Sequence, residues 1–327
     1  MEIFHVFRTK FLPHPFQKDL FESDALKESP YATPEELLSS FLTKRFDLPA
    51  TKSNGTTEIY RAEVWGKQEG IVYTVVANNK IKNTTDENHE KVANPDHPYS
   101  DVIFDLRPER GYLFVQRNSA FSSRPDSVVK IIRDALNDKL RDYGLKLEVT
   151  GFNSEANDFW TIVNNIRTNF HDTVRNASID FPTDPSVSRA ISQDAMLNSV
   201  MQMALKSNSD EALISVTSYS EEGIDLQQCH DDLTQILNIC LTQGAPIGLR
   251  LNFKEFGIFR FGNDLDAQFG IDREQLEEFR LISSEAPAGR SKEIDDFALT
   301  QWIGRCTDTL ENYAEKPLTF KRRKRSR

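Results

Sequence analysis

Two aromatic side chains, Tyr112 and Phe114, lie two residues apart near the middle of the stretch 102–149. Residues two apart on an extended strand point to the same face, so both rings would project together. Paired rings can stack on unpaired bases, and arginines can bind the phosphates of the same strand. The surrounding arginines are Arg107, Arg110, Arg117 and Arg124. The stretch therefore predicts binding of single-stranded nucleic acid, either RNA or DNA.

The octapeptide 110–117, RGYLFVQR, resembles the RNP1 sequence of RNA-recognition motifs. In that family two aromatic residues on one strand face stack on bases, so the resemblance implies this role for Tyr112 and Phe114. Leu113 replaces a small residue of the pattern, and Arg117 replaces an aromatic one. No helix is expected before the first strand, so the chain is not assigned to the family. The alternative interpretation is that both rings face a hydrophobic core.

Three acidic residues, Asp96, Asp101 and Asp105, lie just before and within the first strand of the same hairpin. Carboxylates at short range around a hairpin can hold a divalent ion that activates water for nuclease chemistry. Such sites also need a lysine two residues after an acid on the second strand, and the chain has Arg117 and Asn118 there instead. A metal-dependent nuclease is therefore kept as an alternative function.

Other catalytic and ligand-binding signatures are not found. Cys229, His230 and Cys240 lack the close pairs that a structural zinc site needs. The glycine-rich phosphate loop of ATP-binding proteins and the GxSxG turn of serine hydrolases do not occur. We expect a non-enzymatic protein with no cofactor and no metal.

The charge of the chain is unevenly distributed over its 327 residues, with a net charge of −10. Removing the six basic residues of the last seven positions leaves −16 on the rest of the chain. An acidic body repels a phosphate backbone at long range, so a local basic surface or the tail would have to offset it. Three interpretations of this tail stay open: a solvated chain end, a nucleic-acid contact or a nuclear import signal. Its basic residues are Lys321, Arg322, Arg323, Lys324, Arg325 and Arg327.

The compartment is expected to be reducing. Three scattered cysteines cannot form a disulfide framework, and the N-terminus lacks a signal-peptide layout. No run approaches the roughly 18 apolar residues of a membrane span. We therefore expect a cytoplasmic protein that does not bind membranes.

The elements that would position Tyr112 and Phe114 form one unit. Strands 102–106 and 111–117 flank a turn with Pro108 and Gly111. A helix follows from Asp126 or Ser127 to a terminating Gly144, with its apolar residues at helical spacing, and a strand returns at 145–149.

The N-terminal part is expected to mix strands and one helix. A strand at 2–7 precedes an irregular segment at 11–33. Thr33, Pro34 and Glu36 form a capping signature for a helix that Pro49 stops. A hairpin of 57–65 and 70–78 turns at 66–69, and 81–100 reads as a long polar loop.

The C-terminal part is predicted to contain both helices and strands, without a strict alternation of the two. Helices are expected at 154–170, 186–207, 225–242, 272–280 and 293–313, and strands at 212–218, 247–253 and 256–261. The prolines of 173–188 suggest a linker. The expected organisation is an α+β fold. Its parts are an N-terminal domain at 1–172, the linker, a C-terminal domain at 189–316 and a basic tail at 317–327.

Together these patterns predict a binding protein that associates with nucleic acid or with a protein partner, a homo-oligomer included. The alternatives are the nuclease and a structural oligomerisation module. An acidic chain of this mixed order resembles, in general texture, accessory proteins of bacterial anti-phage defence and mobile-element operons.

Overall fold

The computed structural model describes residues 2–14, 30–51, 55–68, 70–85, 91–121, 125–153, 156–192, 195–242, 248–261, 267–285, 298–310 and 314–318. It contains both helices and antiparallel sheets, so the α+β class is confirmed. The chain divides into two compact units. The larger comprises 2–151, 271–303 and 316–327, and the smaller comprises residue 1, 152–270 and 304–315.

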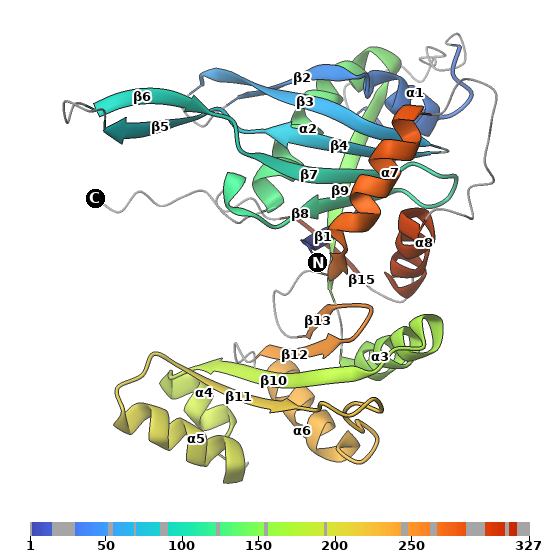
Figure 1. Ribbon diagram of the computed structural model, residues 1–327. Helices are drawn as coiled ribbons and strands as arrows, with labels where there is room; N and C mark the ends of the chain where they lie inside the picture. Colours follow the sequence, from blue (N-terminus) through green and yellow to red (C-terminus); the bar gives the residue numbers. More distant parts are fainter. Residues whose placement is uncertain are drawn as a thin grey trace. The chain divides into compact units, whose positions relative to one another are not determined.

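The larger unit is built on an antiparallel sheet with strand order β9-β1-β8-β7-β4-β3-β2 (Figure 1). These strands are β1 (Glu2–Pro13), β2 (Arg45–Thr51), β3 (Thr57–Gln68), β4 (Ile71–Ala77), β7 (Tyr99–Asp105), β8 (Tyr112–Gln116) and β9 (Leu145–Asn153). Two further strands, β5 (Lys80–Thr85) and β6 (Lys91–Asp96), pair only with each other.

One face of this sheet packs on helix α2 (Pro125–Leu140). Its buried residues recur at helical spacing and join Leu113, Val115 and Phe104 in one hydrophobic cluster. The helix contacts both β2 and β8, although three strands lie between them. Strands are spaced about 4.8 Å apart and a helix is about 10 Å wide, so the sheet must curl around α2. Helix α1 (Pro34–Phe41) adds Leu37 and Leu38 to this core.

Helix α7 (Arg273–Glu285) covers the opposite face of the same sheet (Figure 1). Its Phe279 lies against Gly66 of β3, where a methyl group would come within 2.8 Å of the ring. The guanidinium of Arg280 lies 4.2 Å above the ring of Trp65. Close approach at Gly66 and stacking on Trp65 therefore fix the helix on the sheet.

The smaller unit is a second antiparallel sheet with strand order β11-β10-β12-β13. Its elements are α3 (Ala156–Phe170), β10 (Val174–Pro182), α4 (Pro185–Ala190), α5 (Ala195–Lys206), β11 (Glu211–Thr217), α6 (His230–Thr242), β12 (Gly248–Phe253) and β13 (Ile258–Phe261). Phe181, Leu249 and Leu251 are buried on one face, and Phe159 of α3 packs 5.9 Å from Phe259 between ring centroids. The remaining elements are the 3-10 turns at Ser119–Phe121 and Arg141–Tyr143, β14 (Gln268–Ile271), α8 (Ala298–Leu310) and β15 (Ala314–Pro317).

The prediction of a linker at 173–188 is wrong. Most of it is β10, an inner strand of the second sheet that pairs with both β11 and β12. Pro182 ends this strand and Pro185 begins α4, so the two prolines mark element ends rather than a domain boundary. The helix expected at 186–207 is interrupted between α4 and α5, and the helix expected from 225 begins only at His230.

Two N-terminal predictions are also corrected. Part of the loop expected at 81–100 forms the hairpin of β5 and β6, and the helix that begins after Thr33 ends at Phe41. Pro49 lies in β2 instead of stopping a helix. Proline is tolerated there because β2 is the last strand of its sheet and needs no donor on its outer side. The N-cap at Thr33 is confirmed, since its Oγ1 accepts from the backbone N–H of Glu36 at 3.2 Å.

Candidate functional site

The aromatic pair predicted to stack on bases is buried. Tyr112 and Phe114 point away from Leu113 and Val115, which face α2, but their own face of β8 is covered as well. Tyr112 is 2% exposed, and the guanidinium of Arg8 lies 4.5 Å above its ring. Phe114 is fully buried. The core-facing interpretation of these rings is therefore correct, and neither ring offers a face to a base.

One of the four arginines predicted to bind phosphates, Arg107, has a structural partner. Arg107 holds the carboxylate of Asp105 with two hydrogen bonds, from Nε at 2.8 Å and from Nη2 at 2.7 Å. Asp105 is fully buried, so this bidentate pair neutralises a charge that would otherwise be costly. Arg117 is exposed and Arg110 is half-buried. Arg124 and residues 321–327 lie outside the described residues.

Two of the three acids of the predicted nuclease site, Asp101 and Asp105, do not converge. Asp101 and Asp105 share one face of β7 but are four residues apart, roughly 13 Å along a strand. Asp96 lies in β6, and its side chain is outside the described part. Among the described residues, no group of three or more metal-binding side chains could hold an ion.

Asp101 instead belongs to a buried hydrogen-bond network. The hydroxyl of Tyr73 donates to its Oδ1 at 3.0 Å, and its backbone N–H donates to Oε1 of Gln116 at 3.2 Å. The amide of Gln116 donates to Glu2 at 2.9 Å. Burial raises the pKa of Asp101, and the hydrogen bond from Tyr73 opposes that rise. Burial likewise raises the pKa of Tyr73. This network joins four strands of the sheet, β1, β4, β7 and β8.

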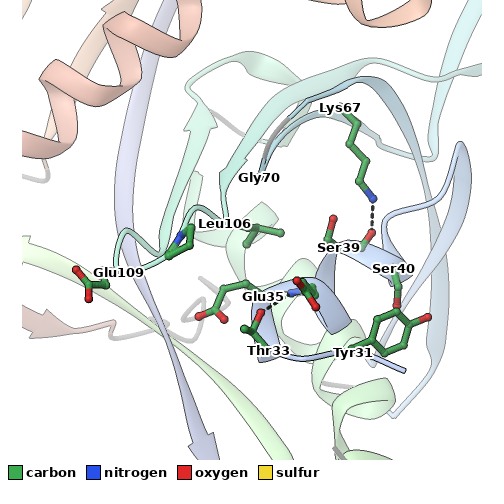
Figure 2. A pocket seen from close by; sticks show the side chains of 11 residues that line it. Tyr31, Thr33, Glu35, Ser39, Ser40, Lys67, Gly70, Leu106 and Glu109 are labelled. Atoms are coloured by element: carbon green, nitrogen blue, oxygen red, sulfur yellow. Dashed lines mark hydrogen bonds between the residues drawn. The ribbon is translucent and has the colours of Figure 1, made fainter. Parts of the chain in front are cut away.

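A pocket of about 600 Å³ lies between α1 and the strand ends of the larger sheet (Figure 2). Lys67 reaches from β3 to α1 and donates to the backbone carbonyl of Ser39 at 2.7 Å. Partial burial lowers the pKa of Lys67. The carboxylate of Glu36 is engaged by the backbone N–H of Ala32 at 2.8 Å. The other lining residues are Tyr31, Thr33, Glu35, Ser40, Gly70, Leu106, Pro108 and Glu109. With three carboxylates and one amine, the pocket suits a small ligand that carries a cation or hydroxyls.

A second groove, of about 680 Å³, lies over β2, β3 and β4. Arg45, Arg61, Asn79 and His97 line it together with the two acids Asp47 and Glu63. Arg45 pairs with Glu63 at 3.7 Å, with both side chains well exposed, so this pair contributes little stability. The groove thus has a mixed charge.

The smaller unit has an exposed apolar surface on α5, β11 and the turn after β11, which we name the α5–β11 surface. Within the described part of the chain, nine large apolar side chains are exposed, and six belong to this segment. Tyr219 is 93% exposed, Met203 66%, Leu213 64% and Val216 58%. The other two are Met196 and Leu205. Helix α5 and strand β11 contact each other, so these side chains lie around the β11 edge of the unit. Leu213 and Val216 are three residues apart and point to opposite faces of β11, so the surface includes both sides of this edge.

Strand β11 is also the outermost strand of its sheet, and no described strand pairs with its outer side. Its sequence was predicted as a strand at 212–218, but its position at an edge depends on pairing between distant segments and could not be predicted from the chain. An unpaired edge leaves backbone N–H and C=O groups available for a further strand, and here they lie beside exposed apolar side chains.

Comparison with known proteins gives no further information: no protein-family model, no curated protein and no solved structure matches this chain. None of the described helices combines the length and the apolar character needed to cross a bilayer.

Proposed function

We propose that this protein acts by binding another protein through the α5–β11 surface. The observation that carries the proposal is the concentration of exposed apolar side chains in residues 196–219. Scattered apolar residues are normal on a protein surface, whereas their gathering in one segment is typical of an interface. The burial of Tyr112 and Phe114 removes the main reason for assigning nucleic-acid binding to β8.

The proposal is tested by site-specific photocrosslinking in cells. A photoreactive amino acid replaces Leu213 on β11 and, in the control, Leu281 on α7, which is 58% exposed. We expect a discrete crosslinked product from position 213 and none from position 281, with mass spectrometry to identify the adduct. The proposal fails if position 213 gives no adduct or the same adducts as position 281.

Nucleic-acid binding at the groove over β2, β3 and β4 is a second candidate function. It is supported by Arg45, Arg61 and His97 along one groove, whereas Asp47 and Glu63 oppose it. Fluorescence anisotropy with single-stranded DNA and RNA would test it. Arg45→Glu with Arg61→Glu should abolish binding, and Arg117→Glu, on an exposed residue that does not line this groove, is the matched control. Equal binding by wild type and the double variant would exclude the groove.

A further inference from the structure

The outer edge of β11 lacks the features that protect most edge strands. Natural edges carry lysine, proline, a bulge or a charge that points inward. Strand β2, at one edge of the larger sheet, follows this rule with Arg45, Asp47 and Pro49. Strand β11, with the sequence EALISVT, has a single charge at its first residue, Glu211. Its pairing with β10 runs over seven residues without a register shift, so no bulge turns it away.

The core of the smaller unit continues to this edge, where it is buried at Ala212 and exposed at Val216. Val216 lies opposite Ala177 of β10, and Ala177 lies opposite the fully buried Leu251 of β12. Directly opposed residues share a face, so Val216 is on the apolar face of the sheet, yet it is 58% exposed. Ala212 and Ile214 lie on the same face of β11. A further strand along β11 would complete this apolar layer.

We infer that a second copy of this chain supplies that strand, with β11 pairing antiparallel to β11 around a two-fold axis at Ile214. This inference rests on the proposed function and names its partner. Ile214 then lies opposite Ile214, Val216 opposite Ala212, and Leu213 opposite Ser215. The apolar face of one copy continues into that of the other, because directly opposed residues point to the same side.

The local charge of the edge is compatible with this partner. The chain without its last seven residues has a net charge of −16, so two copies repel each other over most of their surfaces. Residues 212–220, ALISVTSYS, contain no charged side chain. In the two-fold register Glu211 lies opposite Thr217, so the pairing sets no like charges against each other. Pairing along this edge therefore adds no like-charge contact to the general repulsion between two acidic chains.

A strand pair alone buries less than the roughly 800 Å² per partner of a typical stable interface. The exposed apolar side chains of α5 and Tyr219 are available to enlarge the contact. We therefore expect an association that depends on protein concentration.

The register is tested with two double variants of the full chain. Leu213 and Ser215 are both exposed and lie opposite each other across the proposed seam, so substitutions there leave the core intact. Leu213→Lys with Ser215→Lys places lysine against lysine twice, whereas Leu213→Lys with Ser215→Glu places lysine against glutamate twice. Light scattering after size exclusion measures the mass, and circular dichroism confirms that both variants fold.

We expect wild type to reach twice the chain mass of 37.4 kDa with rising concentration. The lysine–lysine variant should remain at the chain mass, and the lysine–glutamate variant should dimerise. A monomeric wild type overturns the inference, as does a dimer that survives in the lysine–lysine variant or is absent in the lysine–glutamate variant. If wild type is monomeric while position 213 crosslinks to a different protein, the proposed function stands and this inference fails.

Discussion

At the scale of single residues, buried charges and their partners define the larger unit. The pair of Arg107 and Asp105 and the network of Asp101, Tyr73 and Gln116 lie on the same face of the sheet, where every polar atom needs a partner. Arg107, predicted to bind phosphate, therefore pairs with Asp105, predicted to bind metal. Asp101, the other described acid of the predicted metal site, accepts a hydrogen bond from Tyr73. The distinction can be tested, because substitution of a charged residue with a structural role lowers the free energy of unfolding, whereas substitution of an exposed ligand-binding residue leaves it nearly unchanged.

Substitution of Arg107 should destabilise the protein. Arg107→Ala leaves the fully buried carboxylate of Asp105 without its cation, which costs about 3 kcal/mol of unfolding free energy. Urea unfolding measures the loss. Adding Asp105→Asn should restore part of it, because the uncompensated charge disappears. Arg117→Ala, at an exposed position, is the control and should change stability by less than about 0.5 kcal/mol. Equal effects of the two arginine substitutions would contradict a structural role for Arg107.

The stability of the fold should fall as pH rises through the titration of Asp101. Burial raises the pKa of this acid above its ordinary value of 3.8, so the folded state binds the proton more tightly than the unfolded state. The folded state is therefore penalised once the carboxylate ionises, and the penalty grows from about pH 4 up to the folded-state pKa. Asp101→Asn keeps an acceptor for Tyr73 and removes the charge.

The measurement is the free energy of unfolding from pH 4 to pH 7 in wild type and Asp101→Asn. We expect this free energy to decline less with rising pH in Asp101→Asn than in wild type. The stability of the variant relative to wild type should therefore be highest near pH 7. Parallel curves would show that Asp101 titrates as an ordinary carboxylic acid.

At the scale of elements, α7 depends on the close approach at Gly66. Gly66→Ala would place a methyl group 2.8 Å from Phe279, and the shift needed to relieve this contact costs about 1–3 kcal/mol. Gly304→Ala is the matched control. Gly304 lies in α8 with no atom near the position of a new methyl group, so alanine should stabilise that helix by up to about 1 kcal/mol. Thermal unfolding distinguishes the two, and a neutral Gly66→Ala would show that α7 is not tightly packed there.

Local signals in the sequence predicted elements well where neighbouring residues determine them. Thr33 caps α1 as expected, and Gly144 ends the 3-10 turn that follows α2, in a left-handed conformation with a φ of 69°. Prediction failed where pairing between distant segments decides the outcome. Pro49 fits in β2 because that strand is at an edge, and the polar sequence of β10 is held between two partners. The covering of Tyr112 and Phe114 on both faces also required tertiary information.

At the scale of the whole molecule, neither unit is one continuous stretch of chain. The larger unit takes α7 from residues 271–303, far from its sheet in the sequence. A fragment of residues 1–151 contains the seven strands that surround α2 but lacks the helix on the opposite face. The order of elements thus makes the larger unit depend on chain that follows the smaller one.

This dependence predicts how the fragment 1–151 behaves. Without α7, the apolar groups around Trp65 and Tyr73 lose their cover, so the fragment should bind a hydrophobic dye and unfold at lower urea concentration than the full chain. Trp65 is its single tryptophan and reports directly on this face. Adding a peptide of residues 271–285 should shift the fluorescence of Trp65 to shorter wavelength as the helix covers the ring. The same peptide with Phe279→Ala should bind more weakly, because it loses the contact at Gly66. A fragment that is as stable as the full chain and does not respond to the peptide would show that the sheet is complete without α7.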